Sequence, residues 1–415
     1  MSKLEYLQQI ETLKKILLFV LLNSSIYLAI QITAPSGPLR MVIIVLMLSS
    51  VYLLIRSFFQ MYKSEFDTNL YFKVLFTLLM VWSIFTILRS FELNAKVLIS
   101  LFGHFFMGWT WIVPLAIIFG FNIRNWLHIF NFMGKILLFS AIAGLGVAFY
   151  SGTIIFSILE WMTFLPVMLM TYFYQNKKNK KIIIFSVLMF LVLTIFASQR
   201  TNFLFLGLML LAMLFEFYRQ SEVSILKKLA IFYVVVIGSL LFSFQAESVY
   251  NSLANDDEVT TDTRTFLFEE MFDDMKGKDL VFGRGALGTY YSPYFDSLIK
   301  SGIAGGDSAT RSTSEVGYLH IILKGGYVML GLYLLILLPA SYMGIFMSNN
   351  IISRMSGYYI LFHIIIWAIS YSPIYAPKFI LLWMAVGSAI SRTGRKIKNS
   401  NLLVNNNGRI EFAKE

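Results

Sequence analysis

The sequence has no cysteine, and only 14% of its 415 residues are charged. The absence of cysteine excludes disulfide bonds and thiolate metal sites, and it gives no indication of the redox compartment. The low share of charge accompanies 57% hydrophobic and 16% aromatic residues, with a mean hydropathy of +0.70. Soluble domains are only about 45–50% apolar, so the composition predicts an integral membrane protein.

Several catalytic motifs are also missing. The chain has no Walker loop, no His-Glu-x-x-His, no Gly-x-Ser-x-Gly and no paired-histidine ligand set. Nucleotide hydrolysis, serine hydrolysis and zinc chemistry are therefore not expected, and we predict no metal and no cofactor. The neighbouring acids Asp256, Asp257 and Glu258 lie in a polar stretch and are interpreted as solvated.

Apolar runs long enough to cross about 30 Å of hydrocarbon recur along the chain. We predict an all-α polytopic membrane protein with about twelve transmembrane helices, the first a retained signal anchor. The 97–119 run has an alternative division into two pieces at the sequence GWTW. The predicted spans are 16–34, 41–58, 70–88, 97–119, 131–150, 153–173, 182–198, 202–218, 228–245, 326–346, 356–373 and 377–391.

The net charge of +11 is distributed unevenly between alternate connections. Lys and Arg concentrate in the breaks that lie inside if the N-terminus is cytoplasmic, such as the run from Lys177 to Lys181. Basic residues fix the orientation of membrane helices in this way, so both termini are predicted to be cytoplasmic. The basic runs need no nucleic-acid partner.

One long connection, 245–314, falls on the predicted outside. It holds twelve of the 23 acidic residues and six basic ones. We therefore predict four parts: spans one to nine in 1–245, an extracytoplasmic loop subdomain in 246–314, spans ten to twelve in 315–391, and a cytoplasmic tail in 392–415.

Two stretches of this loop predict local structure. TRTFLFEEMFDDM places apolar residues at helical spacing opposite acids, which predicts an amphipathic helix. VFGRGALG supplies Gly283, Gly285 and Gly288, which suit a turn or a close backbone approach. The apolar residues of the predicted helix are Phe266, Phe268, Met271, Phe272 and Met275.

A few ionisable residues lie within or beside the outer halves of the predicted spans. A charge near lipid costs roughly 2.5–3.5 kcal/mol, so a partner is expected. Ordinary roles stay open: interface anchoring for Arg200, helix packing for His104 and an ion pair for Glu160. His320 and Lys324 would share a helix face, and Arg311 and Glu315 would do so if the helix begins early enough.

Arginine is the strongest chemical candidate among these residues. A guanidinium keeps its charge and presents a planar fork of donors that fits phosphate oxygens. A lipid-linked diphosphate sugar would compensate Arg200 and Arg264 for their desolvation. A transferase would also need a base for the attacking hydroxyl, and Glu315 is better placed than His320. Arg284, Arg311, His320, Lys324, Glu160 and His104 complete the predicted substrate-binding set.

The order of SQRTNF, TRTFLFEEM, DLVFGRGALG and SEVGYLHIILKGGYVMLGLYL resembles the O-antigen polymerase and O-antigen ligase superfamily. That resemblance implies glycosyl transfer outside the bacterial inner membrane from an undecaprenyl-diphosphate-linked oligosaccharide, without a metal. It also implies a bundle of the membrane glycosyltransferase (GT-C-like) class, a lipid bilayer around it and a chain-length regulator protein as a partner. Arg200 and Arg264 match the arginines implied to hold the diphosphate.

Two departures from the patterns of the superfamily bear on whether the chain resembles its polymerases or its ligases. Ligases have a histidine eleven residues before a glycine of the next span, and here that offset from Gly326 gives Glu315. Polymerases have been described with a repeated Arg-x10-Gly pattern, and the offsets from Arg200 and Arg264 give Leu211 and Met275. The missing histidine favours a polymerase over a ligase, and a lipid-linked glycan flippase or secondary transporter is the alternative from another class.

Overall fold

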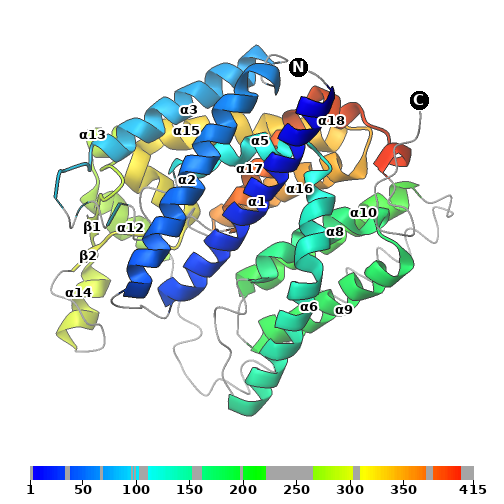
Figure 1. Cartoon of the computed structure of the whole chain (residues 1–415). Coiled ribbons are helices and arrows are strands. Elements are labelled where there is room, and N and C mark those ends of the chain that lie inside the picture. Colours follow the sequence, from blue (N-terminus) through cyan, green and yellow to red (C-terminus); the bar gives the residue numbers. More distant parts are fainter. Residues whose placement is uncertain are drawn as a thin grey trace.

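The computed structural model describes residues 3–32, 38–65, 69–94, 97, 100–101, 111–151, 161–196, 200–220, 265–301, 309–370 and 377–402. These residues form a bundle of helices, with a small group of loop elements at one end (Figure 1). The bundle contains α1 (Lys3–Ile32), α2 (Pro38–Glu65), α3 (Leu70–Leu88), η3 (Val113–Ala116), α5 (Ile117–Phe121), α6 (Asn125–Ser151), η4 (Trp161–Phe164), α8 (Leu165–Thr171), η5 (Tyr172–Tyr174), α9 (Lys177–Phe196), α10 (Arg200–Gln220), α15 (Gly317–Phe346), α16 (Ile351–Trp367), α17 (Pro377–Ile390), α18 (Arg392–Lys396) and η7 (Asn399–Leu402).

The loop elements form a second set in the long connection. They are α12 (Thr265–Asp274), α13 (Lys278–Phe282), β1 (Tyr290–Tyr291), α14 (Pro293–Lys300) and β2 (Thr310–Arg311). The two strands pair antiparallel, with Tyr290 opposite Arg311. Helix α12 confirms the predicted amphipathic helix, and Leu267 and Met271 of the helix and Met275 just past its end are its most buried residues. Leu267 was not in the predicted apolar set, whose Phe266, Phe268 and Phe272 are only partly buried. We call the end of the bundle that carries these elements the loop end.

The all-α prediction is confirmed, because the two-residue strands are the whole of the sheet among the described residues. Helices α3 and α15 are long and apolar enough to span a membrane. The bent pair Val113–Phe121 and Asn125–Phe139, at 107°, makes a third if it counts as one span. The chain thus has the character of a membrane protein, whereas the number twelve stays a prediction and the predicted span 228–245 lies outside the described residues.

Small residues let the central helices approach closely. A Cβ added at Gly120 of α5 would lie 1.9 Å from a carbonyl oxygen of α17, and one at Gly387 of α17 would lie 2.1 Å from a carbonyl oxygen of α5. Helices α15 and α16 meet in the same way, since a Cβ on Gly344 would lie 2.7 Å from the Cα of Gly357. Close backbone contact at small residues is the usual packing of membrane helices.

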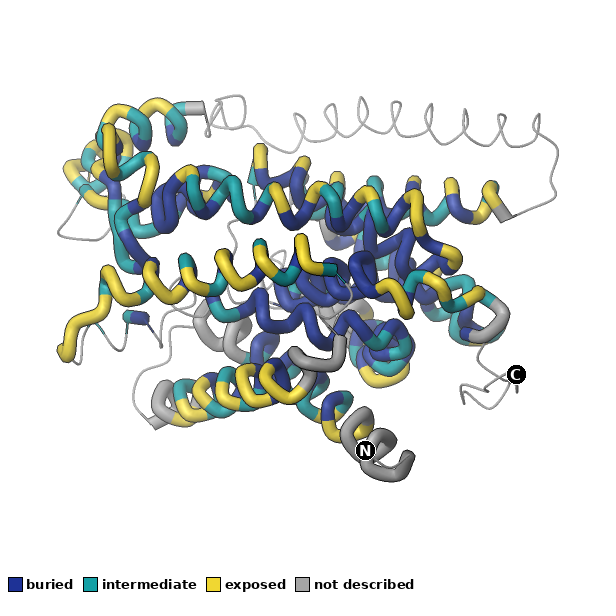
Figure 2. Tube along the Cα trace, turned by 90° about the horizontal axis from the view of Figure 1, so that it is seen from above, coloured by how far each residue is buried: buried dark blue, intermediate teal, exposed yellow. Residues whose placement is uncertain are grey.

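Buried side chains gather where these helices meet, and exposed ones follow the outer sides of the peripheral helices (Figure 2). Trp111, Trp126, Trp367 and Trp383 are among the largest fully buried side chains. The indole of Trp126 donates to the Ser388 hydroxyl at 2.8 Å, so at least one of these rings is fixed by a hydrogen bond as well as by packing.

The end of the bundle opposite the loop end holds a buried ion pair. Nε of Arg354 donates to Oε2 of Glu216 at 2.8 Å, and the two side chains are 6% and 0% exposed. The first turns of α1 and helix α18 lie at this same end (Figure 1). The pair joins α10 to α16 and fixes how these two helices meet.

Replacing Glu216 by Ala should lower the free energy of unfolding by about 3–5 kcal/mol, because it leaves the Arg354 charge buried without its carboxylate. Thermal unfolding in detergent measures the loss. The surface pair of Lys14 and Glu11, at 3.4 Å, is the control, and Glu11→Ala should cost at most about 1 kcal/mol. Equal melting temperatures for the two variants would contradict the structural role of the buried pair.

Candidate functional site

The predicted site residues fall into a described and an undescribed group. His104, Glu160 and Arg264 lie outside the described residues. Arg200 is the first residue of α10, and its side chain is not among those described. The structure therefore bears on the other five, which all lie at the loop end: Arg284, Arg311, Glu315, His320 and Lys324.

Helix α15 is broken near its start. Gly326 has φ +71° and interrupts the helical backbone, so the carbonyls before it lose their helical partners. Buried carbonyls need replacement donors, and here three other groups supply them. Arg284 N donates to Leu323 O at 2.8 Å, Gly285 N to Lys324 O at 3.0 Å, and Trp82 Nε1 to Gly325 O at 2.8 Å.

Glycine makes these contacts sterically feasible. A Cβ on Gly283 would lie 2.3 Å from the carbonyl oxygen of Lys324, and one on Gly326 would lie 2.1 Å from that of Val281. Gly283 also has a left-handed φ of +71°. The close backbone approach expected of VFGRGALG is thus confirmed, and its partner is the broken turn of α15. We call this contact the glycine interlock.

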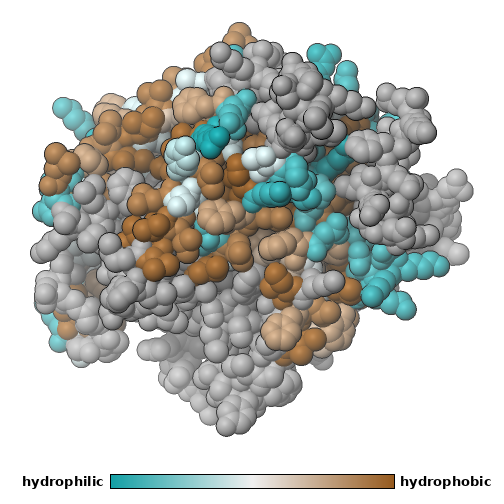
Figure 3. Space-filling view, viewed as in Figure 1, coloured by the Kyte–Doolittle hydropathy of each residue, from teal (hydrophilic) through white to brown (hydrophobic). Residues whose placement is uncertain are grey.

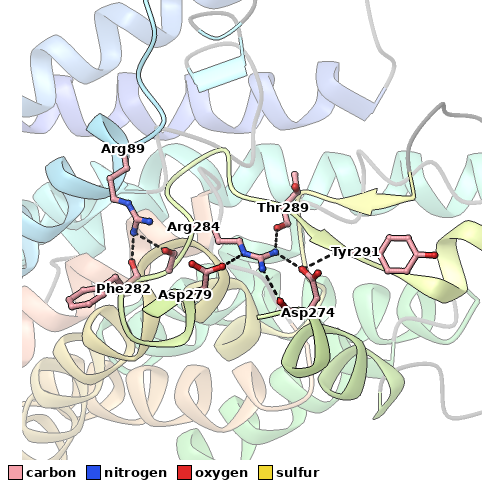
Figure 4. Close-up of polar contacts among 8 residues, drawn as sticks. Arg89, Asp274, Asp279, Phe282, Arg284, Thr289 and Tyr291 are labelled. Carbon is pink, nitrogen blue, oxygen red and sulfur yellow. Dashed lines mark hydrogen bonds and ion pairs between the residues drawn. The ribbon is translucent and has the colours of Figure 1, made fainter. Parts of the chain in front are cut away.

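Residues at the end of α3 bind the glycine-rich loop as well. Nη1 of Arg89 donates to the carbonyls of Phe282 and Gly283 at 2.9 and 2.7 Å, as Figure 4 shows. Ala286 N donates to the carbonyl of Thr86 at 2.9 Å. Arg89 directly follows the predicted span 70–88, and no functional role was predicted for it from the sequence. Nothing in its local sequence indicates that it binds a loop almost 200 residues away.

The guanidinium of Arg284 is engaged on every nitrogen (Figure 4). Nε donates to Asp279 at 2.7 Å, Nη1 to the Asp274 carboxylate and to the carbonyl of Thr289, and Nη2 to the carbonyl of Asp274. Burial alone would lower the pKa of Arg284, but the two carboxylates outweigh it and raise the pKa. Arg284 thus joins α12, α13 and β1, and its predicted substrate contact stays a prediction.

Arg311 has donors to spare. Its Nη2 lies 3.6 Å from Oε1 of Glu315, an ion pair that is too long for a hydrogen bond, and no hydrogen bond from the Arg311 guanidinium is found among the described residues. The Arg311 side chain is 19% exposed and that of Glu315 is 64% exposed. The helix does not begin early enough for Arg311 and Glu315 to share a helix face, because Arg311 lies in β2 and α15 begins at Gly317. The two side chains meet nonetheless.

Tyr290 lies opposite Arg311 in the strand pair and was missed by the sequence analysis. The residue is 1% exposed, and its hydroxyl has no hydrogen-bond partner among the described residues. Burial raises the pKa of Tyr290 to about 12, although the charge of Arg311 opposes the shift. The phenol therefore stays protonated at physiological pH and is able to donate a hydrogen bond but not to act as a base.

His320 and Lys324 are both buried in the first part of α15. Nζ of Lys324 donates to the carbonyl of Gly288 at 2.8 Å and so supports the glycine-rich loop. The His320 ring lies parallel to that of Trp111, with centroids 6.4 Å apart, and within the described part of the chain neither of its nitrogens has a hydrogen-bond partner. Glu315 is open to solvent, whereas His320 is closed off.

Comparisons of the chain with protein-family models, with curated proteins and with solved structures return no match. The candidate site therefore rests on its geometry alone. Within the described residues it comprises the spare guanidinium of Arg311, the open carboxylate of Glu315 and the buried phenol of Tyr290. Such a set suits an anionic ligand that also carries hydroxyl groups.

Replacing Gly326 by Ala should break the interlock, because a Cβ there meets the Val281 carbonyl and the left-handed backbone costs roughly 1–2 kcal/mol for other residues. We expect a lower melting temperature and faster protease cleavage in 281–289. Gly331 of the same helix is the matched control, since a Cβ there meets nothing within 4 Å. Equal melting temperatures and cleavage rates for Gly331→Ala and Gly326→Ala would show that the interlock does not stabilise the fold.

Proposed function

We propose that the chain is a membrane glycosyltransferase that polymerises a surface polysaccharide at the extracytoplasmic face of the bacterial inner membrane. It would transfer an undecaprenyl-diphosphate-linked glycan onto a lipid-linked repeat unit. The observation that carries this proposal is the half-buried Arg311 guanidinium, which has unused donors. It lies beside the exposed carboxylate of Glu315, just before the first residue of the apolar helix α15. A fixed cation at that place fits a phosphate group that is tethered to lipid.

The proposed step requires one proton transfer and one displacement. Glu315 accepts the proton of the acceptor hydroxyl, whose oxygen forms a bond to the anomeric carbon of the donor sugar. The bond from that carbon to the diphosphate oxygen breaks, and the lipid diphosphate leaves with the bonding pair. Arg311, together with Arg200 and Arg264, stabilises the charge on the leaving group, so the step as proposed includes no metal.

The proposed architecture is a GT-C-like bundle of about twelve spans with both termini cytoplasmic. Two features support it. The first turns of α1 and helix α18 lie at one end of the molecule, and the loop elements lie at the other (Figure 1). An even number of spans places both ends of a chain on one side of the membrane, with the acidic loop subdomain on the opposite side.

Replacing Arg311 by Ala should lower the rate of polymerisation about 10- to 100-fold, because a charge-assisted hydrogen bond contributes about 1.5–3 kcal/mol. Arg311→Lys should recover only part of the rate, since an ammonium group lacks the planar fork. The assay uses purified protein in nanodiscs with lipid-linked repeat units and reads the chain-length distribution. Lys300→Ala is the control, because Lys300 is 75% exposed and pairs with Asp296 at the surface of the same subdomain.

Arg200→Ala belongs in the same assay and should give single repeat units from a correctly inserted protein. Unchanged long chains from both arginine variants would overturn the proposal. Transfer to a lipid A core acceptor instead of a repeat unit would identify the ligase reaction. Movement of the intact lipid-linked glycan across the bilayer, with no new glycosidic bond, would identify a flippase.

A further inference from the structure

The lipid-facing side of α3 has a continuation beyond the helix. Along α3, exposed apolar residues follow one another from its first turn to its last, and Figure 3 shows hydrophobic side chains over α2 and α3. The large exposed apolar residues of α3 are Leu70, Tyr71, Val74, Leu78, Val81, Ile84, Phe85 and Leu88. Since α3 is long and apolar enough to span a membrane, this face is the one that lipid would cover.

Four apolar residues extend this face past the end of the span. Phe91 and Leu93 follow α3 directly and are 39% and 92% exposed, and Val281 and Phe282 of α13 are 41% and 42% exposed. We call these four residues the apolar rim. Its two halves are almost 190 residues apart in sequence, yet both lie beside the last turns of α3.

The rim is fixed to α3 by contacts typical of a membrane interface. The ring of Phe282 lies 6.0 Å from that of Trp82, and the guanidinium of Arg89 lies 5.7 Å above the ring of Phe85. The hydrogen bonds from Arg89 to the carbonyls of Phe282 and Gly283 hold α13 at this depth. Tryptophan and basic residues at the end of an apolar span are characteristic of the headgroup layer.

Charges of both signs lie beside the rim: the exposed Glu92 stands between Phe91 and Leu93, and two lysines lie beside Val281 and Phe282. Lys276 lies just before α13 and Lys278 is its first residue, and both are exposed. The nearby Asp279 carboxylate accepts a hydrogen bond from Arg284 and so is partly neutralised. Apolar side chains next to lysines form the pattern of a segment that lies in the membrane interface.

We infer that α13 and the apolar rim form a membrane-interface anchor, which seats the loop subdomain in the lipid headgroup layer next to α3. The occupant of this surface is phospholipid. Continuity with the exposed apolar face of α3 favours lipid over a second copy of the chain. The anchor does not depend on the proposed glycosyl transfer, but it would hold Arg311 near the level of the lipid phosphates.

Because the chain has no cysteine, single cysteines report depth without background labelling. Val281→Cys and Leu93→Cys would each carry an environment-sensitive fluorophore in nanodiscs that hold one protein each. Tyr294→Cys of α14 is the matched control, since Tyr294 is 46% exposed and α14 lies away from α13 on the subdomain (Figure 1). Quenching is compared between lipids with a headgroup-proximal nitroxide and aqueous iodide.

We expect the labels at positions 281 and 93 to be quenched at least twofold more by the nitroxide lipid than by iodide, and the label at position 294 to show the reverse. Similar iodide quenching at 281 and 294 would overturn the anchor. Protection at 281 from both quenchers, in particles shown to hold two copies, would assign the surface to a second copy and would also overturn it. Size-exclusion profiles identical to that of the parent protein confirm that each labelled variant is folded.

Discussion

The contact between the glycine-rich loop and the broken turn of α15 is the constraint on which the loop end depends. A helix break at membrane depth is tolerated only where other groups satisfy the freed backbone. Here the break at Gly326 exposes carbonyls, and the loop supplies amide donors at Arg284 and Gly285. Neither segment would be stable in this conformation without the other, because each provides what the other lacks.

The consequences extend outward from that contact. With the loop fixed, Arg89 reaches its carbonyls from α3, and Arg284 binds the acids of α12 and α13. Nη1 of Arg89 and all three guanidinium nitrogens of Arg284 are used in holding the fold. Arg311 lies next to Glu315 in the same subdomain, and its guanidinium keeps unused donors. A rigid seat with one spare guanidinium is a reasonable arrangement for binding an anion in a fixed orientation.

The sequence predicted those features that depend on local pattern. Apolar runs gave helices at α1, α2, α3 and α15, and the spacing of the aromatic and Met residues gave α12. The glycine spacing predicted a close backbone approach. In each case the pattern is short in range, and the physical cause lies within a few turns of the chain.

The sequence did not predict which residues contact one another between different elements. The role of Arg89 and the burial of the Tyr290 phenol arise from contacts with other elements. The partners of Arg284 lie only five or ten residues away, but the turns between them follow no periodic pattern. The pair of Arg311 and Glu315 shows this limit, because it forms between β2 and the segment just before α15 and not on one helix face. Periodicity records which side of an element is buried but not against what.

Hydrogen exchange at the amides of Arg284 and Gly285 measures the interlock most directly, because both amides donate to carbonyls of α15. In the intact protein in nanodiscs, we expect these two amides to exchange as slowly as the amides of α15 around Gly326. Exchange at the rate of an unprotected peptide would show that the loop is not seated on the broken helix, and the candidate site would lose its support.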